Sequence, residues 1–272
     1  MPKQSDILDV MNDYKSKGAP FALATVVRTV SVTAAKAGAK AVILADGTIT
    51  EGWIGGGCAR GAVLKAAREA LAHGQSRLVS IQPDEQLSEH QVKPGELREG
   101  VVYAKNMCPS QGTMDVFVEP VLPRPNLLIC GASPVAIALA DLARRMGFFV
   151  TICAPEADHA SFGETDRLID GYAVPLDGSE RDYVVIATQG RGDSAALKAA
   201  VQAPSKYLAF VGSRKKAAAL KADLAESGMS PAQLENIHAP AGLDLGAITP
   251  DEIAFSIVAE MIEIRRRGQR TL

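Results

Sequence analysis

Three consecutive glycines and a cysteine form the part of this sequence best suited to chemistry. Residues 52–58 read Gly-Trp-Ile-Gly-Gly-Gly-Cys, and a helical pattern follows over residues 59–72. Glycines suit a backbone with positive φ or one that a ligand approaches closely. Cys58 is expected at or near a helix N-terminus, where unpaired N–H groups and the macrodipole lower the pKa of a thiol. The alternative is a tight strand-to-helix turn with a half-buried cysteine.

Cys108 lies in a second turn-rich stretch, residues 107–113, which reads Met-Cys-Pro-Ser-Gln-Gly-Thr. Two loop cysteines in one small domain could ligate a soft metal such as Cu(I), hold a sulfur-bearing ligand or relay sulfur. The alternative is two unrelated thiols. Cys130 and Cys153 lie on predicted interior strands and are interpreted as buried small hydrophobes. A hydrolytic role for Cys58 is not expected, because no His–acid pair is evident in its half of the chain.

The turn that starts at Gly131 occupies the place of a dinucleotide-binding fingerprint, between a first strand and a first helix. Gly131 supplies the first glycine, but Ser133 stands at the second position and Ala136 at the third. Cys153-Ala154-Pro155 replaces the acidic residue expected after the second strand. The pattern therefore predicts the fold strongly and NAD(P) binding weakly. A phosphate could still bind the helix N-terminus with the Ser133 hydroxyl as an added donor.

Two further loops carry charged or polar groups. Residues 212–216, Gly-Ser-Arg-Lys-Lys, combine a turn, a hydroxyl and three cations at a predicted helix start. Such a turn lies at the carboxyl edge of a doubly wound sheet, so it predicts either an anion site or a solvated basic cap. Residues 238–246 form a glycine-rich loop that holds His238 and Asp244. A lone histidine is more often structural, yet a loop of this length needs a reason to stay ordered.

Strand patterns dominate the first half of the chain. A helix is predicted over residues 7–17 and a strand over residues 21–30. Residues 41–54 form a hairpin whose Asp46-Gly47 pair is typical of a type I′ turn, and the hairpin leads into the glycine triplet. Further strands are expected over residues 77–81, 101–104 and 114–121, and the polar residues 82–100 are interpreted as an exposed excursion.

The second half alternates strands with helices, which predicts a parallel sheet covered on both faces. Prolines 120, 123 and 125 mark the boundary. The fold class is therefore α/β, with an N-terminal α/β domain of mixed or antiparallel strands (1–122) and a C-terminal Rossmann-like doubly wound parallel sheet (123–272). The last helix begins with a capping box, in which Thr249 precedes Pro250 and Glu252.

Composition limits the classes of function. The chain has 272 residues, a net charge of −2, 47% hydrophobic and 22% charged residues, and four cysteines. Near-neutral charge argues against nucleic-acid or anionic membrane partners. The longest apolar runs are strand-sized and the N-terminus has no signal-peptide core, so a cytoplasmic protein is expected. Four scattered cysteines form neither a disulfide framework nor a zinc motif.

Several motifs in this order resemble the XdhC/CoxI family, the maturation factors of molybdenum hydroxylases. They are Gly38-Ala39-Lys40, Asp46-Gly47, the Gly55–Cys58 stretch, Gly212-Ser213-Arg214-Lys215, His238-Ala239-Pro240, the loop 242–246 and the residues 249–254. The resemblance covers nearly the whole chain, and residues 107–112 and 131–136 look closer to the carbon monoxide dehydrogenase-associated branch.

The resemblance implies a chaperone that binds molybdenum cofactor, as the bare pterin or a cytosine dinucleotide form. It would assist cofactor sulfuration with a cysteine desulfurase and deliver the cofactor to an apo molybdenum hydroxylase of the xanthine or carbon monoxide dehydrogenase type. A homodimer would be unsurprising. The alternatives are an NAD(P)-dependent oxidoreductase and a Cu(I)-handling factor for the Mo-Cu site.

The candidate residues fall into two groups. Cys58 and Cys108 are the catalytic and metal-binding candidates. The cofactor-binding candidates are Lys40, Gly55, Gly56, Gly57, Gln111, Gly131, Ser133, Ser213, Arg214, Lys215, His238 and Asp244.

Overall fold

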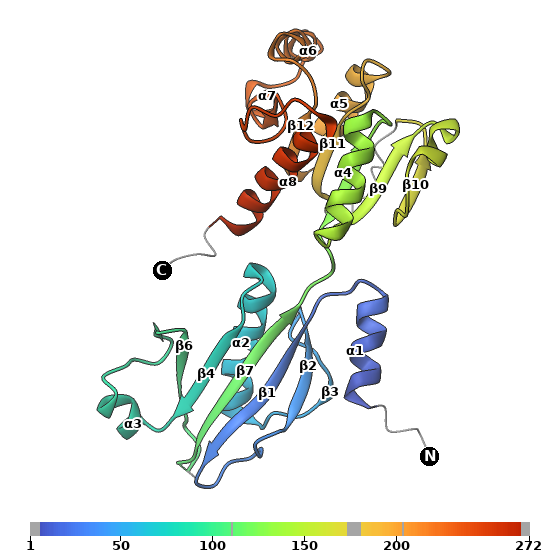
Figure 1. The fold of residues 1–272 in the computed structure, drawn as a ribbon. Helices are drawn as coiled ribbons and strands as arrows, with labels where there is room; N and C mark the ends of the chain where they lie inside the picture. The colour runs from blue at the N-terminus through green and yellow to red at the C-terminus, as the bar shows by residue number, and fades with distance from the viewer. Residues whose placement is uncertain (1–5, 110, 173–180, 203, 268–272) are drawn as a thin grey trace. The chain divides into compact units, whose positions relative to one another are not determined.

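The computed structural model describes residues 6–109, 111–172, 181–202 and 204–267; the side chains of Cys58, Arg181 and Asp182 lie outside this description. The chain forms two compact units, Met1–Pro123 and Arg124–Leu272 (Figure 1). Each unit has its own sheet and its own hydrophobic core. Within the described residues, no helix is both long and apolar enough to cross a membrane.

The first unit is built on a seven-stranded mixed sheet with the order β3-β2-β1-β7-β4-β6-β5. β4 and β6 run parallel, and the other neighbouring pairs are antiparallel. The elements are α1 (Ile7–Ser16), β1 (Phe21–Val30), β2 (Lys40–Leu44), β3 (Ile49–Gly52), α2 (Gly57–His73), β4 (Arg77–Gln82), α3 (Asp84–Glu89), β5 (Leu97–Arg98), β6 (Val101–Lys105) and β7 (Thr113–Val121).

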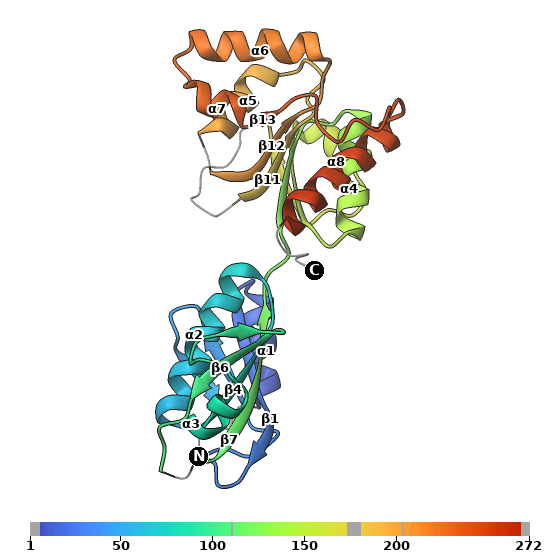
Figure 2. The same cartoon turned by 90° about the vertical axis from the view of Figure 1, so that its left-hand side faces the viewer.

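Helix α2 covers one face of this sheet. Its small residues Ala66, Ala67 and Ala70 are buried against alternate side chains of the strands, such as Val79 and Val116. Small side chains allow the helix to lie close to the sheet. Helix α1 lies on the opposite side, where Tyr14 contacts the buried ring of Phe21 (Figure 2). Asp6 is the N-cap of α1, because its carboxylate accepts a hydrogen bond from the Leu8 N–H.

The hairpin between β2 and β3 differs from the expected type I′ turn. A type I′ turn needs positive φ at two central residues, but at this turn only Gly47 has it, with φ +90°. The Gly47 N–H instead donates to the carbonyl of Leu44, and the Asp46 carboxylate accepts from the Thr48 N–H. The loop is therefore a type I turn followed by a left-handed glycine, and the Asp46 carboxylate stabilises it through its hydrogen bond from the Thr48 N–H.

Residues 82–100 contain more structure than the predicted exposed excursion. They form α3 and β5, and Leu87 and Val92 are buried. Gln82 is buried too, and its side-chain amide donates to the hydroxyl of Ser80. The sequence does not reveal this structure because the buried apolar side chains of the segment are too few to produce a periodic pattern.

The second unit contains a six-stranded parallel sheet with the order β10-β9-β8-β11-β12-β13. Numbered within the unit, this is the 3-2-1-4-5-6 order of a doubly wound dinucleotide-binding fold. The elements are β8 (Asn126–Cys130), α4 (Pro134–Arg145), β9 (Phe149–Ala154), η1 (Glu156–Ser161), β10 (Arg167–Asp170), β11 (Arg181–Ile186), α5 (Asp193–Val201), β12 (Ser205–Phe210), α6 (Arg214–Glu226), α7 (Pro231–Glu235), β13 (Ile237–His238) and α8 (Pro250–Arg266).

The sheet of the second unit separates two helix layers. Helices α4 and α8 pack on one face, and α5 and α6 pack on the other (Figure 1). Alternate residues of each strand enter the two cores; in β11, Tyr183 and Val185 face α4 and α8, whereas Val184 and Ile186 face α5 and α6. The prediction of a parallel sheet with helices on both faces is confirmed.

Candidate functional site

Three loops meet at one end of the first unit, where β1 ends and β7 begins (Figure 1). A Cβ placed on Gly55 would lie 3.7 Å from the Cβ of Ala34, in the loop after β1. A Cβ on Gly112 would lie 2.3 Å from the carbonyl oxygen of Val32, in the same loop. The glycine triplet and the turn at residues 107–112 therefore both contact the loop at residues 31–38.

The triplet opens helix α2 with unusual backbone geometry. Gly55 and Gly57 have φ angles of +102° and +57°. Gly56 is the N-cap residue and supplies no side-chain hydrogen bond to the first turn. The helix begins two residues earlier than predicted, so Cys58 is its second residue. The N–H groups of this first turn are therefore not capped by the side chain of the N-cap residue, which favours an anion there.

Asn106 organises the turn that carries Cys108. Its Oδ1 accepts from the Cys108 N–H at 2.9 Å, and its Nδ2 donates to the Gly112 carbonyl at 2.6 Å. The Gln111 N–H donates to the Cys108 carbonyl, and Gln111 has φ +52°. Cys108 is exposed. The sequence reading missed Asn106, although a polar amide shortly before a glycine in a tight turn is a usable signal.

Two basic residues of the first unit make polar contacts with strand residues. Lys40 Nζ donates to the Thr25 hydroxyl at 2.9 Å, and the Lys40 carbonyl accepts from the Trp53 N–H just before the triplet. Arg28 Nε lies 2.5 Å from Oδ2 of Asp115, whose other oxygen accepts from the buried Ser80 hydroxyl. Lys40 is thus positioned by its neighbours on the strands that lead into the glycine triplet.

Gly131 directly follows β8 in the second unit, where its backbone comes close to Ala187, the residue after β11. Its φ is +113°, and a Cβ there would lie 2.4 Å from the carbonyl oxygen of Ala187. Ser133 is the N-cap of α4, because its hydroxyl accepts from the Ala136 N–H at 3.2 Å. The Ser133 hydroxyl is therefore already engaged by its own helix. The strand order places the ligand crevice of such folds here, between the carboxyl ends of β8 and β11.

A buried carboxylate joins two turns at the same edge of this sheet. Asp193 accepts hydrogen bonds from the Thr188 hydroxyl and, at 3.2 Å, from the Gly190 N–H, and it forms an ion pair with Lys216. Burial acts to raise the pKa of Asp193, but these donors outweigh burial, so the pKa lies below its usual value. The sequence reading missed Asp193, which links the turns after β11 and β12.

The positive charge of the basic turn after β12 is partly neutralised by a nearby carboxylate. Ser213 caps α6 by accepting from the Lys216 N–H. Arg214 Nη2 lies 3.2 Å from Oδ2 of Asp244, and both side chains are more than 80% exposed. The structure therefore brings together two predicted site residues, Arg214 and Asp244, while Lys215 is exposed.

Glu260 of α8 fixes the loop that follows β13. Its carboxylate accepts from Nδ1 of His238 at 2.7 Å, from the Tyr207 hydroxyl at 2.5 Å and from the Gly242 N–H at 2.9 Å. Burial acts to raise the pKa of Glu260, but the three donors outweigh it and the pKa lies below the usual value. Burial, together with Glu260, raises the pKa of Tyr207. The sequence reading missed Glu260, because nothing in its helical pattern separates it from a surface glutamate.

Metal binding by Cys58 and Cys108 remains a prediction. Among the described residues, no group of three or more His, Cys, Asp or Glu side chains is arranged to hold a metal ion. Cys130 and Cys153 are fully buried, as predicted, and lie opposite each other on β8 and β9.

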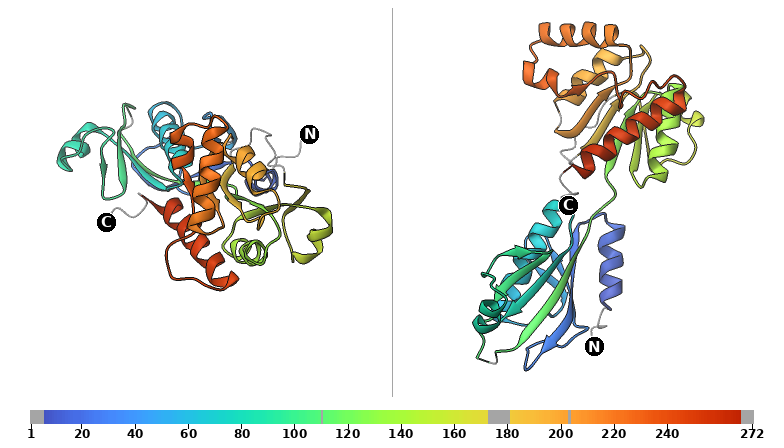
Figure 3. Two further views of the ribbon diagram at one scale, coloured as in Figure 1. Left: turned by 90° about the horizontal axis from the view of Figure 1, so that it is seen from above. Right: turned by 60° about the vertical axis from the view of Figure 1, so that its left-hand side comes forward.

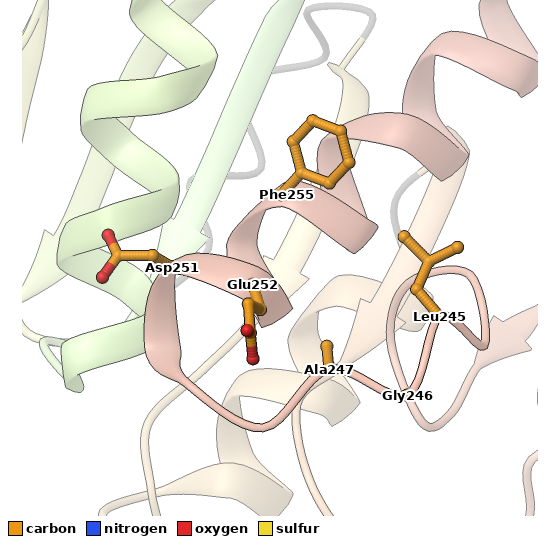
Figure 4. Close-up of a pocket in the computed structure, with 6 residues that line it drawn as sticks. All are labelled: Leu245, Gly246, Ala247, Asp251, Glu252 and Phe255. Carbon is orange, nitrogen blue, oxygen red and sulfur yellow. The ribbon is translucent and has the colours of Figure 1, made fainter.

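A cavity of about 430 Å³ lies in the second unit, beside the last helix. It is formed by the loop before α8 and the first turns of α8 (Figure 4). Its lining residues are Leu245, Gly246, Ala247, Asp251, Glu252 and Phe255. These described lining residues include none of the predicted site residues.

Comparison with known proteins gives several matches. Over 263 residues the chain is 29% identical to the uncharacterized protein YqeB of Escherichia coli (strain K12), covering 93% of this chain and 45% of that protein. Over 163 residues it is 29% identical to a probable xanthine dehydrogenase subunit of Bacillus subtilis (strain 168), covering 57% of this chain and 47% of that protein. A solved structure of a xanthine dehydrogenase from Bacillus halodurans aligns with a TM-score of 0.47 and 18% identity, over 97% and 96% of the two chains.

The chain spans less than half the length of these two curated relatives. Residues 15–82 match the model of the XdhC and CoxI family, and residues 127–261 match the model of the XdhC Rossmann domain. The two matches lie in the two units and together cover most of the chain, in the order that the motifs predict. The chain therefore belongs to the XdhC/CoxI family.

Proposed function

We propose that this protein is a maturation factor for a molybdenum hydroxylase. In this role it binds molybdenum cofactor, assists sulfuration of the cofactor and delivers it to the apo hydroxylase. The meeting of the glycine triplet, the Cys108 turn and the loop at residues 31–38 at one end of the first unit carries the proposal. The name of the Bacillus subtilis relative, a probable subunit of xanthine dehydrogenase, supports the class of client.

The residues of the first unit fit a ligand that combines anionic and sulfur-bearing groups. The first-turn N–H groups of α2, preceded by the N-cap Gly56, suit negatively charged atoms. Lys40 adds a cation on the strands that lead into the triplet. Cys58 and Cys108 would approach the metal or accept sulfur, and Gln111 would contact the ligand from the Cys108 turn. The cofactor is cargo in this scheme, and the protein supplies binding and orientation.

The second unit would bind the phosphate or nucleotide part of the cofactor. Gly131 and Ser213 lie in turns that follow the carboxyl ends of strands, where ligands of doubly wound sheets bind, and Lys215 lies in the first turn of α6. The hydroxyls of Ser133 and Ser213 cap their own helices, so the neighbouring N–H groups and Lys215 are the available donors. Arg214 and Asp244 would separate when Arg214 binds an anion, and His238 would contact the ligand through Nε2.

Binding of the isolated cofactor to the purified full chain tests the proposal. The wild type should retain molybdenum cofactor through gel filtration, while Cys58→Ala and Cys108→Ser should reduce retention at least several-fold. Gly61→Ala is a matched control, because Gly61 lies one turn after Cys58 and a Cβ there would contact nothing. The proposal fails if the wild type retains no cofactor.

Delivery needs a separate measurement. Loaded protein should raise the activity of a purified apo molybdenum hydroxylase, and a cysteine desulfurase with a sulfur source should increase this effect. If the protein retained the cofactor but transferred none to the apo hydroxylase, it would be a cofactor-binding protein without a role in insertion. Loading with Cu(I) under reducing conditions tests the copper-handling alternative, in which Cys108→Ser should lower the copper stoichiometry.

A nicotinamide-dependent oxidoreductase is the second candidate function. The 3-2-1-4-5-6 strand order and the positive φ of Gly131 favour it. Against it, Ser133 holds the position at which glycine lets the backbone reach a pyrophosphate, and Ala154 ends the second strand where an acidic residue would bind ribose. Titration with NADH and NADPH, followed by fluorescence, separates the two functions. An absence of binding at millimolar cofactor would remove this candidate.

A further inference from the structure

Trp53, the single tryptophan of the chain, lies two residues before the glycine triplet and is 53% exposed. An indole ring carries a large apolar area, so tryptophan side chains are on average highly buried. Strand β3 brings Trp53 to the end of the sheet at which β1 ends and β7 begins, because β3, β2, β1 and β7 are successive antiparallel neighbours (Figure 3). The exposed residue therefore lies at the same end of the first unit as the candidate site.

The backbone on both sides of Trp53 is held in place. The Trp53 N–H donates to the Lys40 carbonyl at 2.9 Å. Gly52 has a φ of +81°, and a Cβ there would lie 2.1 Å from the same carbonyl oxygen. Ile54 is fully buried in the core of the first unit. Trp53 is thus a half-exposed aromatic residue on a preformed backbone, so a ligand that binds it has little chain entropy to overcome.

The glycines that follow Trp53 leave open space and suit an anion. Among the atoms of the described residues, none lies within 4 Å of a Cβ placed on Gly56 or Gly57. The first-turn N–H groups of α2 receive no side-chain cap from Gly56, and Lys40, whose carbonyl binds the Trp53 N–H, adds an exposed cation. Two residues of chain span at most about 7 Å. A single small ligand can therefore reach both the Trp53 ring and the glycine N–H groups.

We propose that Trp53 is the stacking platform for the flat pterin ring of molybdenum cofactor, while the glycine N–H groups and Lys40 bind its anionic groups. The inference rests on the proposed function and adds the residue that recognises the heterocycle. Indole rings stack on flat heterocycles as aromatic side chains stack on nucleobases. An exposed tryptophan can also anchor a protein partner, but the residues beside Trp53 are bare glycine backbone and a cation, which fit a flat, negatively charged ligand better.

Three substitutions at Trp53 separate stacking from simple apolar contact. Equilibrium dialysis of the full chain against isolated molybdenum cofactor, with molybdenum measured on both sides, gives the dissociation constant. Trp53→Ala and Trp53→Leu should each raise it about 5- to 150-fold, as expected for the loss of one stacked ring. Trp53→Phe keeps a flat ring and should stay within about threefold of the wild type. Leucine is the decisive case, because it retains an apolar side chain without a flat face.

Tryptophan fluorescence gives a second readout, because all of its emission comes from Trp53. Molybdenum cofactor and neopterin, a free pterin without dithiolene or phosphate, should both quench it beyond their effect on free tryptophan, whereas inorganic phosphate should not. Leu97→Ala is the matched control. Leu97 is 57% exposed on β5, at the opposite edge of the sheet from β3, and its replacement should change neither quenching nor the dissociation constant. Circular dichroism checks that each variant is folded.

The outcomes separate this inference from the proposed function. If the wild type binds cofactor and Trp53→Ala binds it equally well, stacking is overturned while the proposed function holds. A Trp53→Ala variant that loses only transfer to the apo hydroxylase would place the ring against the protein partner, which also overturns stacking. If the wild type binds no cofactor, the proposed function fails. The neopterin titration then tests Trp53 alone, and an absence of quenching overturns the stacking platform.

Discussion

Nδ1 of His238 lies 2.7 Å from Oε1 of Glu260, which places a carboxylate from the last helix under the loop that follows the last strand. The same carboxylate accepts from the buried Tyr207 hydroxyl and from the Gly242 N–H. A single side chain thus fixes the orientation of the His238 ring and the path of the loop behind it. In the proposed site, His238 would contact the ligand through its other ring nitrogen, Nε2.

Replacement of Glu260 should make the free energy of unfolding less dependent on pH in the acidic range. The folded-state pKa of Glu260 lies below the ordinary value of 4.5, so its ionised form stabilises the fold above about pH 4.5, and this contribution is lost as the pH falls through the lower folded-state pKa. Glu260→Gln should lower the free energy of unfolding by about 2–3 kcal/mol at pH 7, because it weakens three hydrogen bonds to a partly buried anion. Thermal unfolding of wild type and variant should converge as the pH is lowered from 7 to 3.

Glu263→Gln is the matched control for this comparison. Glu263 lies on the same helix, is 55% exposed and is 3.8 Å from Arg267. An exposed pair of this kind contributes less than about 1 kcal/mol. Equal losses in the two variants at pH 7 would show that the contacts of Glu260 add nothing specific.

Gly131→Ala should destabilise the second unit by about 2–4 kcal/mol. The new Cβ would lie 2.4 Å from the Ala187 carbonyl oxygen, and the residue would keep φ near +113°. Denaturant titration gives the change in the free energy of unfolding. Gly163→Ala, at an exposed glycine with no neighbour within 4 Å of its new Cβ, should change it by less than about 0.5 kcal/mol. A tolerated Gly131→Ala would contradict the close approach of β8 and β11.

Gly112→Ala should separate the Cys108 turn from the loop at residues 31–38. The added Cβ would lie 2.3 Å from the Val32 carbonyl oxygen, so one of the two segments must move. Hydrogen exchange in both segments should become faster, and retention of molybdenum cofactor should fall. Gly61→Ala should instead stabilise the chain by about 0.5–1 kcal/mol, because alanine is the better helix former at an open site. Unchanged exchange at residues 31–38 would show that the contact does not hold the loop.

The cysteines should differ in reactivity towards iodoacetamide. Cys108 is exposed, whereas Cys130 and Cys153 are fully buried in the second unit. Mass spectrometry after brief labelling of the native protein should find Cys108 modified and both buried cysteines protected until denaturant is added. Labelling of Cys130 in the native protein at the rate of Cys108 would contradict the packing of β8.

Most strands and long helices could be predicted because their apolar spacing and their glycine or proline boundaries are local signals. The bounds of β1 and the capping box of α8 are examples. The missed features depend on distant partners. β13 has only two residues and is defined by its pairing with β12. Glu260 lies 22 residues from His238, so its role becomes visible only when α8 packs beside the end of β13.

The site residues also separate into those with a local sequence signal and those whose role depends on distant partners. Glycines such as Gly131 could be recognised because a positive φ restricts the residue type at one position. Ser133 and Ser213 each come just before a predicted helix, so they carry the same local N-cap signal as Thr249. The contact between Arg214 and Asp244 joins residues 30 positions apart, so it depends on the tertiary fold. Asp193 was missed because its partner Lys216 comes from the next helix.

The sheet of the second unit has a consequence for how this protein can diverge from its relatives. Because the β-strands send alternate residues into two separate cores, the side chains that pack α4 and α8 are a different set from those that pack α5 and α6. One helix layer can therefore accumulate compensating core substitutions while the side chains of the other layer stay the same.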